Sequence, residues 1–598
     1  MTLDDRLNML RNAGLIRDAG TAPEKEYIFQ HALLQEAAYD SLLKQDRKRL
    51  HLAVGQALER SYPEQLEELS PLLARHFEEA ADDDRALTYF VLAGEQAMRR
   101  FALPEAVAHS TSAIAIARRC RAPLAKLYRA RGLAYEGRGD YERARADQEA
   151  ALDYARAAQD QRAEWQALID LGKLWAERDY GKTGEYFQQA FDLARTLGDP
   201  ATLAHSLNRL GNWYINVERP QEARRHHHEA LTIFQQLQDR RGIAQTFDLL
   251  GMTNMLGGDL VQGAVYYRQA ITLFRELDER VDMASSLTTV ALGAAEHQAS
   301  TAVLSAKNIP EAQRDAEQAL QIARESGWRS AEAFALIVLA TCQGSRGHFT
   351  NALESVNRGL EIAMEIRHRQ WMTYAYSMLG EIRQDLFALS AARQSLEQAL
   401  VLANESGSWH WIRTVVGFLA SVCVAQNDLA AAQAALDAAP AADDPPQTLG
   451  QRLVYCSRVE LALARGDPHR ALEIVDQLIA SGAHAKPDGS NILGVSILRG
   501  RALTALGNFD QAQVALLAAR EIAATQGALP VLWQIHAALA QLYRSQGRSE
   551  QADAALAAAR AVVQELADEI ADGTLRKSFE EGAREMLNHK ERDGSLSA

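Results

Sequence analysis

The sequence contains few cysteines, and they lie far apart. There are four in 598 residues, at Cys120, Cys342, Cys423 and Cys456. No two of them form a CxxC pair, so the sequence indicates neither a zinc site of the usual spacing nor a disulfide framework. We expect each cysteine to be a small buried side chain in a protein of a reducing compartment.

Long apolar runs and a secretion signal are also missing. No stretch approaches the roughly 20 apolar residues that span a bilayer. The first residues, MTLDDRLNMLRNAG, lack the basic start and apolar core of a signal peptide. Positively charged residues are outnumbered: the sequence has 64 Lys and Arg against 78 Asp and Glu, which gives a formal net charge of −14. We therefore predict a cytoplasmic protein without membrane partners, and the negative net charge argues against a nucleic-acid ligand.

The most informative feature of the sequence is an internal repeat of about 40 residues. The segment LGNWYINVERPQEARRHHHEALTIFQQLQD, from Leu210, aligns with LGMTNMLGGDLVQGAVYYRQAITLFRELDE, from Leu250. A small residue recurs in the same register at Gly132, Gly172, Gly211, Gly251, Ala340, Gly380, Ala420, Ala462, Gly500 and Ala540. Each repeat has the apolar spacing of two amphipathic helices joined by a tight turn. One repeat cannot bury its own apolar stripe, so the repeats should stack into an all-α solenoid.

This pattern resembles the tetratricopeptide repeat (TPR) family over residues 86–568, about twelve repeats. The resemblance implies a superhelix of helix pairs whose first helices line a concave groove. Two places depart from the period. About eight extra residues within HQASTAVLSAKN should lengthen a first helix or its turn, and APAADDPPQ should form a local break before the short repeat that contains ARGDPHRA.

The N-terminal segment has a different pattern. We predict a helix at 4–14 stopped by Gly14, a β-hairpin at 15–30 and a helix at 31–45. The stretch YIFQHALLQEAAYDSLL, with RKRLHLAVGQALE, resembles the junction between winged-helix domain and repeats in bacterial STAND and related AAA ATPase regulators. Many of those carry a class III nucleotidyl cyclase or a kinase. In that family a histidine matching His31 contacts nucleotide phosphate; here Ala32 replaces the usual next Asp, which favours a capping or packing role.

The resemblances divide the chain into four parts. Residues 1–60 would be a partial winged-helix domain, and residues 61–440 the N-terminal part of the solenoid. Residues 441–585 would be its C-terminal part with capping helices, and residues 586–598 a disordered tail. The chain would then be the C-terminal part of a larger regulator, or a truncated relative that acts in trans.

Two motifs suggest chemistry but fit the repeat better. Gly181, Lys182 and Thr183 match the end of a phosphate loop, but they lie in a repeat turn without a preceding strand. The consecutive His226, His227 and His228 would point about 100° apart on a helix, so at most two could reach one metal ion. We therefore predict no catalytic residues, no cofactor and no metal.

A polar stripe on one predicted first helix is the most informative feature for binding. Its members, three to four residues apart, are His205, Asn208, Asn212 and Asn216. An Asn side chain can bond a peptide backbone through both its donor and its acceptor. Neighbouring first helices would add Lys173, Gln245, Asp248 and Met252. The alternative is an ordinary solvated helix face.

A second candidate contact lies at Trp409 and Trp411, which flank His410. The two rings cannot both face inward easily, so we expect one at the surface, available to a partner.

These features favour a non-enzymatic scaffold or sensor that binds a protein or peptide in its groove. The alternative is the regulatory part of a nucleotidyl cyclase or STAND/AAA ATPase, with such a module as the partner. A DNA-binding regulator is a third class, which the acidic charge disfavours.

Overall fold

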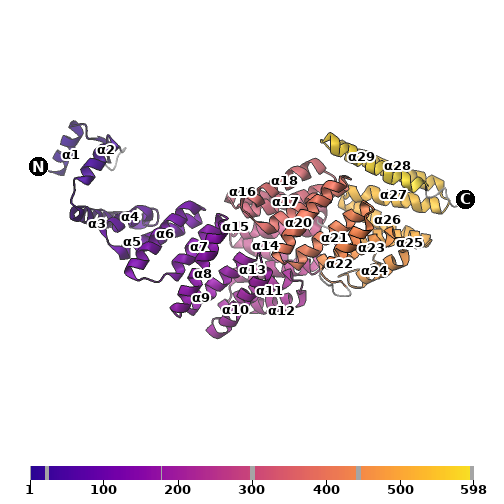
Figure 1. Ribbon diagram of the computed structural model, residues 1–598, viewed down its shortest axis with the longest axis horizontal. Helices are drawn as coiled ribbons and strands as arrows, with labels where there is room; N and C mark the ends of the chain where they lie inside the picture. Colours follow the sequence, from indigo (N-terminus) through magenta and orange to yellow (C-terminus); the bar gives the residue numbers. More distant parts are fainter. Residues whose placement is uncertain (1, 20–25, 177, 296–302, 440–445, 593–598) are drawn as a thin grey trace. The chain divides into compact units, whose positions relative to one another are not determined.

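The structure is a computed structural model that describes residues 2–19, 26–176, 178–295, 303–439 and 446–592 (Figure 1). The chain forms two compact units, Met1–Ala163 and Glu164–Ala598. The described residues are predominantly helical, and their strands are confined to one two-stranded sheet. This confirms the all-α prediction; the four-part division of the chain stays a prediction.

The first unit begins with a helix, a hairpin and two further helices. Its elements are α1 (Leu3–Asn12), β1 (Ile16–Asp18), β2 (Tyr27–Phe29), α2 (Ala32–Asp40), α3 (Lys44–Ser61), η1 (Pro63–Gln65), α4 (Ser70–Ala80), α5 (Asp83–Arg99), α6 (Leu103–Cys120), α7 (Ala125–Gly137) and α8 (Tyr141–Ala157). Thr2 and Asp5 form a capping box at the start of α1, and Gly14 follows the helix with φ +69°. The strands pair antiparallel with Ile16 opposite Phe29, as the hairpin prediction requires.

One N-terminal prediction is wrong. The expected helix at 31–45 ends at Asp40, and α3 starts anew at Lys44. The Arg47 side chain reaches back to hold this break, because it donates to the carbonyls of Asp40 (2.9 Å) and Leu42 (3.1 Å). His31 occupies the N-cap position of α2 but its side chain makes no capping hydrogen bond. The winged-helix assignment itself stays a prediction.

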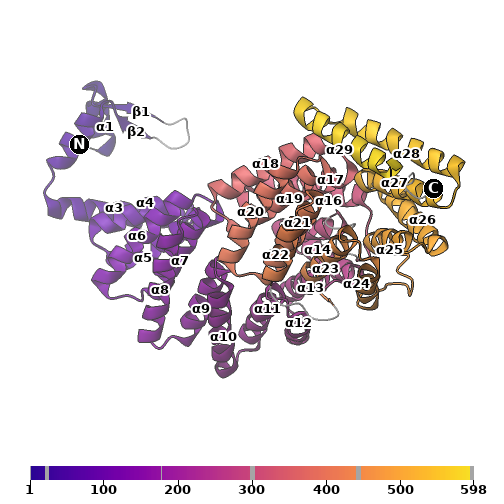
Figure 2. The ribbon, with the colours of Figure 1, turned by 45° about the vertical axis from the view of Figure 1, so that its right-hand side comes forward.

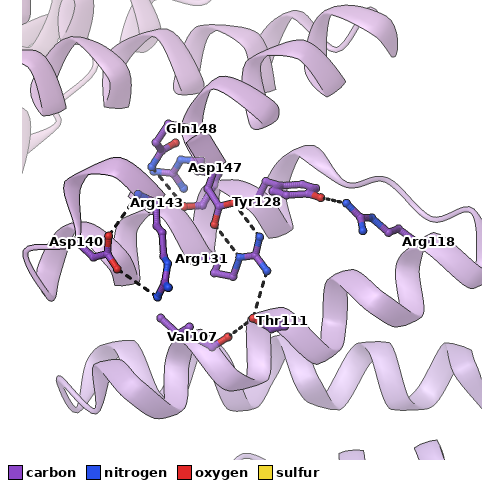
Figure 3. A network of polar contacts seen from close by, with 10 residues as sticks. Val107, Thr111, Arg118, Tyr128, Arg131, Asp140, Arg143, Asp147 and Gln148 are labelled. Atoms are coloured by element: carbon purple, nitrogen blue, oxygen red, sulfur yellow. Dashed lines mark hydrogen bonds and ion pairs between the residues drawn. The ribbon is translucent and has the colours of Figure 1, made fainter. Parts of the chain in front are cut away.

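The later helices of the first unit already pack as repeat pairs. Arg131 of α7 makes a two-pronged ion pair with Asp147 of α8, at 2.7 and 2.8 Å, and also donates to Thr111 of α6 at 3.2 Å (Figure 3). Arg131 thus ties three successive helices together. Cys120, at the end of α6, is exposed, so the expectation of a buried cysteine is wrong there; the other three cysteines are buried.

The second unit is a continuous series of helix pairs. The unit boundary falls within α9, and the elements are α9 (Gln161–Trp175), α10 (Tyr180–Leu197), α11 (Pro200–Asn216), α12 (Pro220–Gln236), α13 (Arg240–Leu256), α14 (Leu260–Glu276), α15 (Arg280–Ala295), α16 (Ile309–Ser326), α17 (Arg329–Arg346), α18 (Phe349–Glu365), α19 (Arg369–Asp385), α20 (Leu389–Ser406), α21 (Trp409–Ala425), α22 (Leu429–Ala438), α23 (Leu449–Ala464), α24 (Pro468–Ala480), α25 (Leu493–Ala505), α26 (Phe509–Gln526), α27 (Leu529–Ser545), α28 (Ser549–Asp568) and α29 (Gly573–Arg592). From α11 to α27 the odd-numbered helices are the first helices of the repeats.

Local sequence explains where these helices start and stop. Asp179, Asp239 and Asp259 each accept a hydrogen bond from a backbone N–H of the following turn, which satisfies an amide that the helix leaves unpaired. Several second helices end at a glycine in the left-handed region, such as Gly327 at φ +69°. These signals recur because every repeat must make the same two turns.

The small residues of the repeat mark where a first helix receives a large side chain from its second helix. A Cβ at Gly251 would lie 2.8 Å from the Tyr267 ring, and one at Gly380 would lie 2.5 Å from Leu396. Alanines at the matching register of the second helices, such as Ala392, are fully buried. The predicted register is therefore the packing register.

The second unit also makes contacts between repeats that are far apart in sequence. First helix α13 touches α23, and α17 touches α27. Thr448 donates to Glu218 at 2.8 Å, and the Glu218 carboxylate pairs with Arg413. Thr350 accepts from the N–H of Ala571 at 3.0 Å. The series of repeats thus winds back on itself in this unit.

The irregular segments are placed as follows. The described part of α15 ends at Ala295, and α16 begins at Ile309. Residues 296–302, where the extra residues around HQASTAVLSAKN begin, lie outside the described residues, as does 440–445 of the predicted break. The tail prediction is wrong for 586–592, because α29 continues to Arg592 and Leu587 is buried. Figures 1 and 2 show α29 lying along α28, which it contacts.

Candidate functional site

The polar stripe on α11 is partly a packing feature. Asn208 is only 3% exposed and Asn216 only 7%. The Asn208 amide donates to Thr246 of α13 at 2.8 Å, and its oxygen lies 3.1 Å from Nδ1 of His227 on α12. The expectation of a solvent-facing stripe is therefore wrong for these two residues, because the superhelix brings α12 and α13 against that side of α11.

Asn216 closes the end of the same helix. Its oxygen accepts from the Tyr180 hydroxyl at 3.1 Å, and its amide donates to the backbone oxygen of Asn212 at 2.9 Å. His205, at the start of the stripe, packs edge-on against Phe234 with ring centres 5.0 Å apart. Burial lowers the pKa of His205. Both ends of the stripe therefore contact neighbouring helices.

Three of the four predicted flanking residues, on α9 and α13, lie away from the cavity described next. Lys173 lies 4.0 Å from the Asp170 carboxylate, and Gln245 is half-buried. Ser286 donates to the Asp248 carboxylate, while burial raises the pKa of Asp248 to about 6. Lys173, Gln245 and Asp248 do not line that cavity, whereas Met252, the fourth flanking residue, does.

The second unit contains a cavity of about 270 Å³, here called the neutral cavity. Four residues predicted for ligand contact line it together: Asn212, Asn216, Met252 and Trp411. The remaining lining residues are Ala176, Tyr180, Met255, Leu256, Leu260, Ser285, Thr289, Leu292, Gly293, Phe334, Gln370, Trp371, His410 and Leu449. Most of these positions lie on first helices from α11 to α23, so the winding of the repeats creates the cavity.

The two tryptophans of α21 have different environments. Trp409 is 45% exposed, and the central carbon of the Arg413 guanidinium lies over its ring, 5.5 Å from the ring centre. Trp411 is 6% exposed and lines the neutral cavity. The structure thus places one ring at the surface and one inside, as the sequence argument requires.

A second cavity, of about 200 Å³, was not predicted and is here called the acidic cavity. Glu381 and Asp385 of α19 and Glu460 of α23 line it, with Arg501 of α25. Burial raises the pKa of Asp385 to about 8. Burial also raises the pKa of Glu460, and the positive charge of Arg501 partly offsets that increase. The available signal was the position of these acids on first helices, but other first helices also carry acids, and only the winding brings these three together.

The motifs set aside in the sequence make packing contacts with neighbouring side chains. Lys182 stands in the first turn of α10, its ammonium 3.8 Å from the centre of the Trp175 ring. His226 stacks on Tyr214 with ring centres 5.3 Å apart, and His227 is fully buried. Within the described ranges, no three His, Cys, Asp or Glu side chains come together in a metal-binding group, and no helix is long and apolar enough to cross a membrane.

The paired helices, their close-packed small residues and the inward-facing first helices define the class of tetratricopeptide-type α-solenoids. A family model described as MalT-like TPR region matches residues 210–532, more than half of the chain, and a tetratricopeptide repeat model matches 125–157. The chain belongs to the family of MalT-like TPR regions. No curated protein matches its sequence.

Solved structures of low sequence identity share parts of the architecture. A Rap protein complexed with competence and sporulation factor is 12% identical, with 69% of this chain and 100% of that one covered and a TM-score of 0.40. The apo quorum sensor NprR from B. thuringiensis is 14% identical, with coverage of 56% and 92% and a TM-score of 0.38. A STAND protein with a tetratricopeptide repeat sensor from Pyrococcus horikoshii is 14% identical, with a TM-score of 0.34; 72% of this chain is covered and it spans 57% of that protein.

Proposed function

We propose that this chain is a non-enzymatic scaffold or sensor arm of a cytoplasmic signalling regulator, which binds a protein or peptide along its first helices. The observation that carries the proposal is the neutral cavity, because successive first helices from α11 to α23 contribute to one concave, largely apolar space. A few polar groups in an apolar cavity are typical of ligand sites.

The acidic cavity supports an extended ligand rather than a compact one. It is lined mainly by the first helices α17 to α27, and four of these, α17, α19, α21 and α23, also line the neutral cavity. A peptide could place an uncharged side chain in the neutral cavity and a basic one beside Asp385 and Glu460. Helical grooves commonly read peptides through such side-chain pockets.

Site-specific photocrosslinking tests the proposal. The full chain would carry benzoylphenylalanine at Met252, which lines the neutral cavity, or at Met364 of α18, which is 52% exposed. In extract of the native cells, we expect a discrete crosslinked product from position 252 only. Excess unlabelled wild-type chain should compete, whereas a Met252→Trp chain should not. Identical products from both positions would contradict a ligand in the groove.

A second candidate function is the regulatory arm of a nucleotidyl cyclase or STAND/AAA ATPase. It is favoured by the resemblance of residues 27–51 to the junction between winged-helix domain and repeats. Sequencing the coding DNA upstream of Met1 is the test. An in-frame cyclase, kinase or P-loop ATPase would support this candidate, and an upstream stop codon would leave only a partner in trans.

A further inference from the structure

The walls of the neutral cavity are suited to an aromatic ring. Phe334 and Trp371 stack on one another with ring centres 4.3 Å apart, and both line the cavity. Met252 and Met255 add thioethers, which make favourable contacts with aromatic edges. An apolar cavity of about 150 Å³ can hold benzene, so a volume of about 270 Å³ is enough for a substituted ring.

Two residues of the lining each carry a buried side-chain polar atom that has no hydrogen-bond partner among the described residues. These atoms are the Asn212 side-chain oxygen, an acceptor, and Nε1 of Trp411, a donor. Trp411 is 6% exposed, so water does not reach its N–H freely. A buried polar atom without a partner costs about 1–3 kcal/mol. A ligand that supplies one donor and one acceptor would remove this cost.

Formal charge is absent from the lining. No Asp, Glu, Lys or Arg occurs among the described residues that surround the cavity. An ionised ligand group would therefore be buried without a counter-charge, which is strongly unfavourable. The acidic cavity, with three carboxyl groups, lies on other parts of four of these first helices and on α25 and α27, and it offers the counter-charge that a basic group needs.

We infer that the neutral cavity binds an uncharged aromatic group bearing a hydroxyl, that is, a phenol. The hydroxyl donates to the Asn212 oxygen or accepts from the Trp411 N–H, while the ring packs against Phe334, Trp371 and the methionines. This inference rests on the proposed function and names the chemistry of its ligand. A tyrosine side chain of a peptide and a free phenolic compound share that chemistry.

Three small probes separate ring, hydroxyl and charge. We would titrate the full chain at pH 7 with 4-methylphenol, toluene and 4-methylbenzoate, using ligand-observed NMR. We expect 4-methylphenol to bind, toluene to bind roughly 2- to 13-fold more weakly for each hydrogen bond lost, and 4-methylbenzoate not to bind. Toluene binding as tightly as 4-methylphenol, or no binding by any probe, would overturn the inference.

Variants locate the binding in this cavity. Asn212→Leu should reduce the preference for 4-methylphenol over toluene and leave toluene binding unchanged. Trp411→Phe should have the same effect. It replaces Asn212→Leu in the experiment if that variant has a lowered melting temperature. Met252→Trp should fill the cavity and abolish binding of both probes, whereas Met364→Trp should change nothing. An unaltered preference in both polar variants would overturn the inference.

The two proposals can fail separately. If position 252 crosslinks a partner but no phenol binds, the inference falls and the proposed function stands. If 4-methylphenol binds but no partner crosslinks, the inference stands for a free phenol and the proposed protein ligand falls. N-acetyltyrosinamide distinguishes the two sources. If it binds as tightly as 4-methylphenol or more tightly, the ligand is a peptide side chain; if it does not bind, the ligand is a free phenolic compound.

Discussion

At the scale of single residues, His227 shows how a polar side chain can be part of the core. Its Nδ1–H donates to the oxygen of Asn208, whose amide donates to Thr246, whose hydroxyl donates to the Gly242 carbonyl at 2.7 Å. The chain of bonds links α12, α11 and α13. Because Nδ1 is the donor and Nε2 is buried without a partner among the described residues, the imidazole is held neutral.

This environment predicts a pH dependence of stability. Burial lowers the pKa of His227 to about 3, against about 6.5 in the unfolded chain. The unfolded state therefore takes up a proton that the folded state refuses, and the free energy of unfolding falls by up to about 1.4 kcal/mol per pH unit as pH drops from 6.5 towards 3. The His227→Gln chain should lack this contribution to the pH dependence of its free energy of unfolding. Urea unfolding from pH 4 to 7 measures it, with exposed His469→Gln as the control; identical slopes in all three chains would contradict the assignment.

At the scale of helices, the glycines of the first helices set how closely the two helices of a repeat approach. Tyr267 is 1% exposed and its ring packs against Gly251, so the ring has no free space to move into. Close packing of this kind makes even one added methyl group costly. The same position is filled by Gly211 against His227 one repeat earlier, which explains why the repeat keeps a small residue there.

Gly251→Ala tests this packing. The new Cβ would lie 2.8 Å from the Tyr267 ring, and we expect a local destabilisation of about 1–3 kcal/mol from overpacking. Hydrogen exchange should quicken in α13 and α14. The matched control is Gly573→Ala in α29, where a Cβ meets no atom within 4 Å and should have a neutral or slightly stabilising effect. Equal effects in both variants would refute a packing role for Gly251.

At the scale of the second unit, a buried ion pair joins the turn between α11 and α12 to α21. The side chains of Glu218 and Arg413 are each 2% exposed, and Thr448 at the start of α23 adds its hydroxyl to Glu218. Ser408 also donates to the backbone oxygen of Asn216, at 3.4 Å. These contacts bring together the two sides of the neutral cavity that Asn212 and Trp411 line.

Glu218→Gln should therefore loosen both the winding and the cavity. Removing one partner leaves the other charge buried, which typically costs about 3–5 kcal/mol. We expect faster hydrogen exchange at the starts of α21 and α23. The double variant Glu218→Gln with Arg413→Met should recover part of the loss, since it buries no charge.

The exposed pair Arg470–Glu473 provides the comparison. Its ion pair spans one turn at the surface, so Glu473→Gln should change stability by less than about 1 kcal/mol. If Glu218→Gln were equally mild, the ion pair would not hold the winding.

Within each repeat, much could be predicted because the interactions are short-range. The small residues, the helix caps and the apolar spacing act over one helix pair, so the TPR-type solenoid and its packing register followed from the sequence. The N-terminal hairpin followed in the same way. The break after Asp40 and the helical end of α29 did not, because each depends on one side-chain contact or on packing against α28 rather than on a repeating pattern.

The sequence by itself determined the fold class, the family resemblance and a set of residues on first helices. Only the tertiary structure decided which of them meet. Four residues along a helix turn a side chain by about 40°, so Asn208 enters the packed seam while Asn212 lines the neutral cavity. Trp411 joins Asn212 only because small rotations between successive repeats add up over several repeats. That sum depends on every interface between them, and no single repeat contains it.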